Sequence, residues 1–194
     1  MTGSFARVFL ALPLGAELGN ALLDLARESL GGARVEREFR WPRPEGLHLT
    51  LFFLGDVERS RTGPLWKEVV AGLGGARAPL LRIGSPGSFP GRGRERVLWF
   101  GIEPERSAEL QTLEREVLAA AERAGFDTRE ERARPFHPHV TVARPRGTRG
   151  RVSERFYACR LEADWVAAEL VLFESVTSEG RSLYGPLETL RLAV

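Results

Sequence analysis

The sequence predicts an α+β fold of two pseudo-symmetric lobes, each with an antiparallel sheet and helices, on either side of a central cleft. Two observations support this fold class. The same order of strand, helix and strand is predicted twice along the chain, and a His-x-Thr motif stands at the matching place in each copy. We therefore expect one domain over residues 1–194, made of duplicated halves at roughly residues 1–88 and 94–194.

The first copy begins with the apolar segment Arg7–Leu12, which predicts a strand because Pro13 and Gly15 bound it. A helix is predicted next, since leucines recur at helical spacing until a Gly-Gly pair ends the pattern. These leucines are Leu18, Leu22, Leu25 and Leu30. A proline-rich connecting segment then precedes a second predicted strand, Leu47–Leu54.

The second copy repeats this order. Arg96–Gly101 predicts a strand, and Glu105–Ala124 predicts a helix that stops at Gly125. A proline-containing connecting segment precedes a predicted strand over His139–Ala143. The initial arginines of the two copies stand 89 residues apart and the motif histidines 91 residues apart, so the halves are consistent with duplication.

Each copy is predicted to continue beyond its histidine strand with a helix and further strands. These elements are Leu65–Leu73 (helix) and Pro79–Ile83 (strand) in the first copy, and Val152–Arg160 (helix), Val166–Val176 and Leu187–Leu192 (strands) in the second. The glycine-rich segment Gly84–Gly93 is the expected link between the lobes.

The two motifs, His48-x-Thr50 and His139-x-Thr141, are suited to phosphodiester chemistry. Side chains alternate faces along a strand, so each histidine shares a face with its threonine, opposite apolar neighbours. Histidine titrates near neutral pH, so one imidazole can accept a proton while the other donates one. The threonine hydroxyls can donate to phosphate oxygens, and this chemistry needs no metal.

A metal site is the competing interpretation of the histidines. His137 and His139 would share a strand face, and His48 could complete a set of three ligands. However, Gly46 stands where the first half would need a counterpart of His137, and no carboxylate lies within the motifs. We therefore expect neither a metal nor any other cofactor.

The cations are almost all arginines, with Lys67 the only lysine, although the net charge is only +2. Arginine suits phosphate because its planar guanidinium donates in a fork, but a GC-rich genome would also favour arginine. A basic patch follows the second motif, with five arginines and one acid, Glu154: Arg144, Arg146, Arg149, Arg151 and Arg155. This patch is either a phosphate-binding surface or a solvated loop.

Three further residues stand out. By alternation Phe52 falls on the face of the first motif histidine, where it could stack on a base or pack in the core, and Tyr184 allows the same two interpretations. Cys159 is the only cysteine, which excludes an internal disulfide and fits a reducing cytosol. No apolar run reaches membrane-spanning length, so we expect a cytoplasmic protein without membrane contact.

The paired motifs resemble the two-histidine (2H) phosphoesterase superfamily. Within it, the sequence is most similar to the LigT-like branch, the RNA 2′,3′-cyclic phosphodiesterases that are also described as 2′-5′ RNA ligases. The resemblance covers almost the whole chain. It is carried by Arg7–Leu14, Trp41-Pro42, Leu47–Leu51, Phe53–Gly55, Phe89-Pro90, Arg96–Trp99 and Phe136–Arg144.

The resemblance implies a bilobed fold with a His-Thr pair on each wall of the cleft. It implies metal-independent opening of a 2′,3′-cyclic phosphate at an RNA end to a 2′-phosphate, with reversible ATP-independent 2′-5′ joining as a second activity. By motif position, His48 and His139 would be the acid and the base. Thr50, Thr141 and Arg144 would bind phosphate.

Some alternatives stay open at this point. Phe53 stands at the place in the first motif that Arg144 holds in the second, so the cleft should be asymmetric. The substrate could instead be ADP-ribose 1″,2″-cyclic phosphate or a small cyclic nucleotide, or the chain could be a noncatalytic RNA-binding module. We expect a monomer, because the two lobes already complete a cleft.

Overall fold

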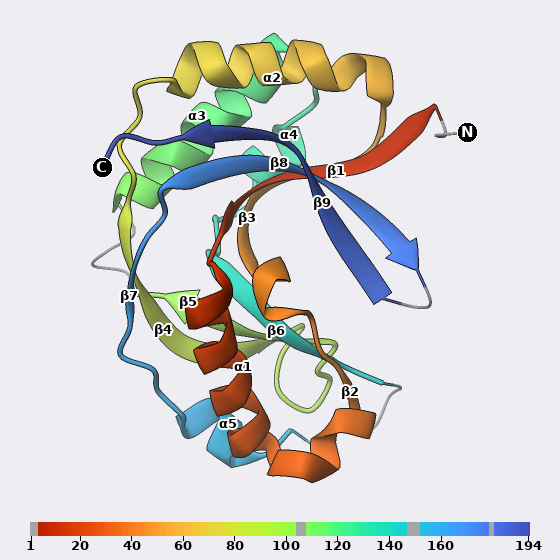
Figure 1. Cartoon of the computed structure of the whole chain (residues 1–194), viewed down its shortest axis with the longest axis vertical. Helices are drawn as coiled ribbons and strands as arrows, with labels where there is room; N and C mark the ends of the chain where they lie inside the picture. Colours follow the sequence, from red (N-terminus) through yellow and green to blue (C-terminus); the bar gives the residue numbers. More distant parts are fainter. Residues whose placement is uncertain (1–3, 104–107, 147–151, 179–180) are drawn as a thin grey trace.

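The computed structural model describes residues 4–103, 108–146, 152–178 and 181–194, and it confirms the α+β fold class. Nine strands form one curled sheet in which every pairing between strands is antiparallel (Figure 1). The strand order is β7-β4-β5-β6-β3-β1-β8-β9, and the short β2 pairs with β6 beside this path.

The strands are β1 (Phe5–Pro13), β2 (Phe39–Arg40), β3 (His48–Glu58), β4 (Leu80–Phe89), β5 (Val97–Ile102), β6 (His139–Pro145), β7 (Asp164–Val166), β8 (Glu169–Ser178) and β9 (Arg181–Arg191). The α-helices are α1 (Ala16–Leu30), α2 (Arg59–Leu73), α3 (Ala108–Arg123), α4 (Arg129–Arg132) and α5 (Glu154–Ala158). Two 3₁₀ helices, η1 (Gly32–Arg37) and η2 (Pro44–Gly46), lie between α1 and β3.

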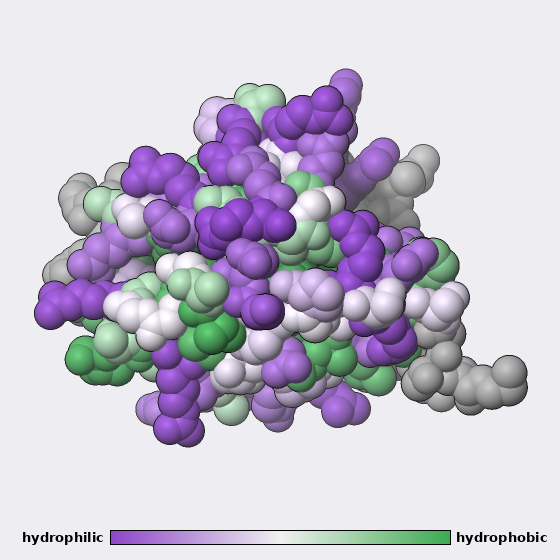
Figure 2. Space-filling model, turned by 90° about the horizontal axis from the view of Figure 1, so that it is seen from above, coloured by the Kyte–Doolittle hydropathy of each residue, from purple (hydrophilic) through white to green (hydrophobic). Residues whose placement is uncertain are grey.

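The sheet divides into two lobes that meet where β3 pairs with β6. One lobe holds β1, β3, β8 and β9 with α2 and α3, and the other holds β2 and β4 to β7 with α1 and α5 (Figure 1). Seen from above, the face that carries α2 is largely hydrophilic, with smaller hydrophobic areas between the hydrophilic side chains (Figure 2). Within the described ranges, no helix is long and apolar enough to cross a membrane.

Each lobe contains strands from both halves of the sequence. β4 comes from the first half and pairs with β5 of the second, whereas β8 and β9 come from the second half and extend the sheet from β1. The expected link between lobes over Gly84–Gly93 is therefore wrong, because Gly84 to Phe89 belong to β4 and the following residues join β4 to β5 within one lobe.

The predicted elements differ from the observed ones mainly at their ends. The helix expected over Glu105–Ala124 is α3, and its first three predicted residues lie outside the described part of the chain. The helix expected over Val152–Arg160 is the shorter α5, and the strand expected over Val166–Val176 is divided between β7 and β8. The expected Leu187–Leu192 segment is the second part of a longer hairpin strand, β9.

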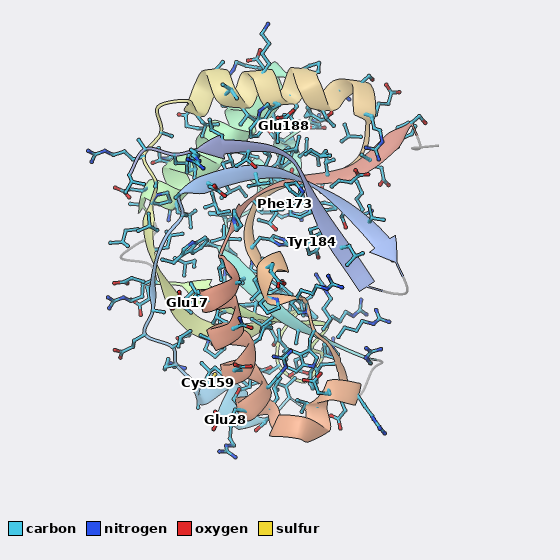
Figure 3. The ribbon with its side chains drawn as sticks, viewed as in Figure 1. Glu17, Glu28, Cys159, Phe173, Tyr184 and Glu188 are labelled. Atoms are coloured by element: carbon cyan, nitrogen blue, oxygen red, sulfur yellow. The ribbon has the colours of Figure 1, made fainter. Side chains whose placement is uncertain are left out.

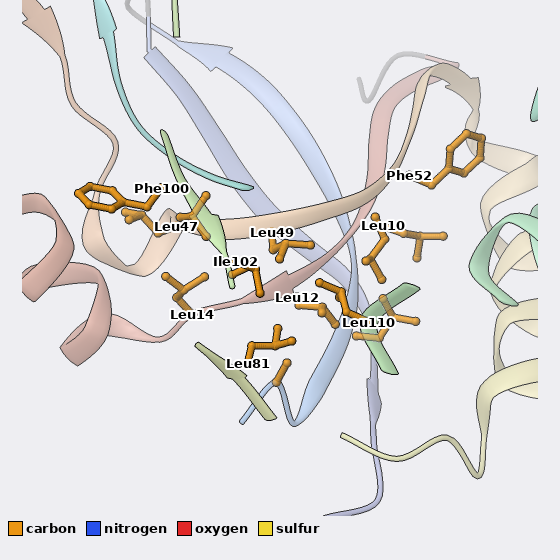
Figure 4. Packing of buried hydrophobic residues seen from close by; sticks show 14 of the residues in the cluster. Leu10, Leu12, Leu14, Leu47, Leu49, Phe52, Leu81, Phe100, Ile102 and Leu110 are labelled. Atoms are coloured by element: carbon orange, nitrogen blue, oxygen red, sulfur yellow. The ribbon is translucent and has the colours of Figure 1, made fainter. Parts of the chain in front are cut away.

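One hydrophobic core runs through both lobes. Leu12 of β1 and Leu49 of β3 pack close to Leu81 and Ile102 of the other lobe (Figure 4). The leucine face of α1 covers this core until Gly31, whose φ of +126° ends the helix in a region that glycine tolerates. The shared core fixes the position of each motif strand relative to the other.

A β-bulge follows each motif threonine at the same place. In β3 the extra residue is Leu51, directly after Thr50, and in β6 it is Val142, directly after Thr141. A bulge adds one residue to its strand and reverses the alternation of faces beyond it. Two successive side chains are therefore buried after each threonine, and the third returns to the face that carries the histidine.

Candidate active site

The two His-Thr motifs lie on one cleft between the lobes. Their strands pair at the middle residue of each motif, Leu49 opposite Val140, and both of these side chains are fully buried. The flanking side chains point to the other face of the sheet, where they line a cleft of about 420 Å³. The lining includes all five residues that the sequence indicated, which are His48, Thr50, His139, Thr141 and Arg144.

A backbone carbonyl orients each imidazole ring in the same way. His48 Nδ1 lies 2.8 Å from the carbonyl oxygen of Gly46, and His139 Nδ1 lies 2.8 Å from that of His137. A carbonyl oxygen can only accept, so Nδ1 carries the hydrogen and donates it. In the neutral ring this leaves the lone pair on Nε2, so Nε2 is the atom that can take up or release a proton.

Aromatic side chains bury the His48 ring. Its centroid lies 4.7 Å from that of Phe9, 4.9 Å from that of Tyr184 and 6.0 Å from that of Phe173. Figure 3 shows Phe173 and Tyr184 on the side of β8 and β9 that faces the centre of the molecule. Burial lowers the pKa of His48 to about 4, and the charge of Arg144 acts in the same direction, so the ring is neutral at pH 7.

The His139 ring lies in the other lobe, against Phe89 at 5.0 Å and Trp99 at 6.0 Å between ring centroids. Burial lowers the pKa of His139 from its ordinary value, and the nearby basic groups of His137 and Arg144 act in the same direction. Both histidines therefore favour the neutral form while the cleft holds no anion.

The bulges place Phe53 and Arg144 at equivalent positions on the cleft. Both line it, whereas the stacking role considered for Phe52 is wrong, since Phe52 is only 3% exposed and packs in the core. Phe53 is 44% exposed, and the guanidinium of Arg7 lies 4.8 Å from its ring centroid. Only the matched spacing of the two motifs could have pointed to Phe53, because alternation alone assigns it to the opposite face.

The two walls of the cleft differ in chemistry. From the lobe of His48 come aromatic, apolar and hydroxyl side chains, with one arginine: Arg7, Phe9, Phe53, Ser175, Ser182, Leu183 and Tyr184. From β2, the segment after it and β6 come Arg40, Trp41, Pro42, Arg43, Ala143 and Arg144. The sequence analysis did not identify Arg40 and Arg43 as cleft residues. The only feature that could have indicated them is their position in the proline-rich segment before the first motif.

Among the described arginines of the expected basic patch, Arg144 alone lines the cleft. Arg146 donates through Nε to the carbonyl oxygen of Phe39, and Arg155 lies on α5, outside the cleft lining. Arg149 and Arg151 lie outside the described residues.

The alternative metal site is not supported by the positions of the histidines. His137 does not line the cleft, and its ring lies 4.8 Å from Trp99 and 5.5 Å from Phe89 between centroids. No group of three or more His, Cys, Asp or Glu side chains among the described residues could hold a metal ion. Cys159 lies at the end of α5, away from Phe173 and Tyr184 (Figure 3).

Comparisons with known proteins agree with this geometry. The family model of the 2′-5′ RNA ligase superfamily matches residues 24–175. An RNA 2′,3′-cyclic phosphodiesterase of Geobacillus stearothermophilus is 36% identical over 70% of this chain, a stretch that covers only 41% of that relative. An RNA 2′,3′-cyclic phosphodiesterase of Methanothermobacter thermautotrophicus is 34% identical over 75% of this chain and 74% of its own length.

A solved structure extends the likeness to nearly the whole chain. The crystal structure of the Thermus thermophilus protein TT0787 superposes with a TM-score of 0.75 at 26% identity, over 95% of this chain and 97% of that one. The match of the family model, the relatives and the paired motifs in one cleft lead to the same conclusion. The chain belongs to the 2′-5′ RNA ligase superfamily.

Proposed function

We propose that this protein is an RNA 2′,3′-cyclic phosphodiesterase, which opens the cyclic phosphate at an RNA end to a 2′-phosphate. The observation that carries the proposal is the convergence of two His-Thr pairs on one cleft, with both rings held through Nδ1. The curated relatives that match this chain carry the same activity in their names.

The two histidines divide the proton transfers between them. One Nε2 accepts a proton from the attacking water, whose oxygen forms a bond to phosphorus. The bond from phosphorus to O3′ breaks, and the protonated Nε2 of the other histidine gives its proton to that oxygen. The phosphate stays on O2′. A 5′-hydroxyl in place of the water would give a 2′-5′ linkage by the same step, which is the proposed second activity.

Thr50, Thr141 and Arg144 bind the non-bridging phosphate oxygens in this mechanism. Two hydroxyl donors and one guanidinium can stabilise the negative charge on the non-bridging oxygens in the transition state. The bound phosphate also opposes the effects that lower the pKa values of His48 and His139. Substrate therefore promotes protonation of the histidine that acts as the acid.

The first experiment is incubation with an oligoribonucleotide that ends in a 2′,3′-cyclic phosphate, in the presence of EDTA. We expect the parent to release a 2′-phosphate end, and His48→Ala and His139→Ala each to lower kcat by about 10²–10⁴-fold. The matched control is His137→Ala, which removes the histidine that does not line the cleft and should retain most of the activity. Turnover that survives either cleft substitution would reject the mechanism.

We also propose that the enzyme works as a monomer in the cytoplasm. One chain supplies both His-Thr pairs and both walls of the cleft, so a second copy is not needed to complete the site. Light scattering coupled to gel filtration should give a mass of one chain, 21.5 kDa, at micromolar concentration. A dimer at that concentration would contradict the proposal.

A further inference from the structure

The cleft carries more positive charge than a terminal cyclic phosphate needs. Four arginines line it, Arg7, Arg40, Arg43 and Arg144, and no carboxylate of the described residues does. Among the described residues, Arg7 alone of these four has an ion-pair partner, Asp56 at 3.9 Å. A cyclic phosphodiester bears a single negative charge, and the neutral histidines do not change this balance at pH 7.

The backbone places Arg40 beside Arg144. The two are directly opposite each other in the β2–β6 ladder, so their side chains extend from the same face of the sheet. Like charges in directly opposite positions destabilise a sheet, and neither guanidinium forms an ion pair with a described residue. Phosphate groups bound to the two guanidinium groups, one to each, would relieve this repulsion, so the pair itself points to a ligand with more than one phosphate.

Arg43 continues this row of arginines. It stands three residues beyond Arg40, in extended backbone at the start of η2, and it lines the same cleft. Arg40 pairs with Arg144 near the end of β6 that is farther from His139, so the row runs from Arg144 away from the two histidines. The opposite wall of the cleft carries mainly aromatic and hydroxyl side chains. Aromatic rings can stack on the bases of a nucleic acid strand, and hydroxyls can form hydrogen bonds with its sugars.

On the basis of the proposed function, we propose that Arg40 and Arg43 form a second phosphate subsite. It binds the phosphodiester that precedes the terminal nucleotide of the RNA, while Arg144 faces the terminal phosphate. The enzyme then favours the ends of oligonucleotides over cyclic mononucleotides, because a cyclic mononucleotide has no second phosphate to bind Arg40 and Arg43.

The test compares two substrates that share the reacting group. One is adenosine 2′,3′-cyclic phosphate, and the other is a trimer of adenylate that ends in a 2′,3′-cyclic phosphate. We expect Arg40→Gln and Arg43→Gln each to raise KM for the trimer about tenfold, with little change in its kcat or in either constant for the mononucleotide. Arg77→Gln, which removes an exposed arginine outside the cleft, is the matched control and should change neither substrate.

Two results would overturn the subsite. An equal rise of KM for both substrates in Arg40→Gln and Arg43→Gln would mean that these arginines bind the reacting phosphate. Unchanged KM and kcat for both substrates would mean that they do not bind substrate. The preference of the parent for the trimer should also decrease as salt is added, because contacts to phosphate are screened. A preference that salt does not change would contradict a charge-based subsite.

A binding measurement separates failure of the subsite from failure of the proposed function. Fluorescence anisotropy of a labelled adenylate trimer with a terminal 3′-phosphate does not depend on turnover. Affinity about tenfold weaker in Arg40→Gln and Arg43→Gln than in Arg77→Gln would support the subsite even if the parent opened no cyclic phosphate. Equal affinity in all three variants would reject it. A thermal melt at low salt checks folding, and Arg40→Gln should match or exceed the parent, since it removes a like-charge neighbour.

Discussion

The two histidines of the cleft share a backbone setting but differ in their neighbours. Each donates from Nδ1 to the carbonyl oxygen two residues before it. His48 is enclosed by Phe9 and Tyr184, whereas His139 has a second imidazole, His137, at 6.3 Å between centroids. Burial is the main reason that the pKa of each histidine is lowered.

The pH dependence of kcat/KM should follow from these lowered pKa values. One histidine must be neutral, which requires a pH above its pKa, and the other must be charged, which requires a pH below its pKa. With a pKa of about 4 for His48 and a pKa below 6.5 for His139, we expect a bell-shaped profile with its maximum in the acidic range. A bound phosphate anion should raise both pKa values by its negative charge, so we expect the kcat profile to lie at higher pH.

Steady-state rates in buffers of constant ionic strength between about pH 4 and pH 9 would measure both profiles. A kcat/KM profile that is flat across this range, or one centred above neutral pH, would contradict the paired histidines in their observed environment.

The sequence predicted the centre of the site better than its walls. Repetition of a short motif at matched positions indicated that His48, Thr50, His139 and Thr141 share a cleft, as they do. Arg40 and Arg43 gave no comparable signal, because an arginine in a proline-rich connection is usually solvated. Their place on the cleft depends on the pairing of β2 with β6, which no local pattern encodes.

At the scale of elements, strand periodicity was reliable only up to the first irregularity. Alternation placed Thr50 correctly with His48 but failed at Phe52, since the bulge at Leu51 reverses the faces. The same bulge after Thr141 explains how an arginine five residues beyond a histidine can share its face. Bulges are set by the fit to a neighbouring strand, so they are difficult to infer from one strand alone.

The contact between β4 and β5 beneath His139 gives a test at this scale. Gly87 lies opposite Trp99, and a Cβ at Gly87 would lie 2.3 Å from two atoms of the indole ring. Gly87→Ala should therefore displace the Trp99 ring, which packs against His137 and His139. We expect a loss of about 1–3 kcal/mol in the free energy of unfolding, together with reduced activity.

Urea unfolding and turnover of the same preparations would measure both effects. Gly185→Ala in β9 is the matched control, because no heavy atom lies within 4 Å of the added Cβ and the change should stay within about 0.5 kcal/mol. Equal stability of the two variants would show that the indole ring yields without strain.

At the scale of the molecule, the sequence indicated the repeated order of elements but not the partners of the strands. Duplication of the halves stays a prediction, and the sheet joins β4 to β5 and β1 to β8 across it. These pairings bring together residues far apart in sequence, so local patterns could not reveal them. The prediction of a link between lobes at Gly84–Gly93 was wrong for the same reason, because the pairing of β4 with β5 could not be inferred from local patterns.

Because each lobe needs strands from both halves, the chain should unfold as one unit. A fragment of residues 1–93 leaves β4 without β5 and β1 without β8, and residues 94–194 lack the complementary partners. We expect one cooperative thermal transition for the whole chain and none for either fragment alone, as followed by circular dichroism. Cooperative unfolding of an isolated fragment would contradict this arrangement.

The carbonyl bonds to His48 and His139 also bear on how the protein tolerates genetic change. In serine proteases an aspartate side chain orients the imidazole, and one codon can remove it. Here the orienting atoms are backbone carbonyl oxygens of Gly46 and His137, so a substitution at either position keeps the acceptor atom. The backbone thus sets the orientation of both imidazole rings. Substitutions at positions 46 and 137 can therefore accumulate while the hydrogen bonds to Nδ1 of His48 and His139 are kept.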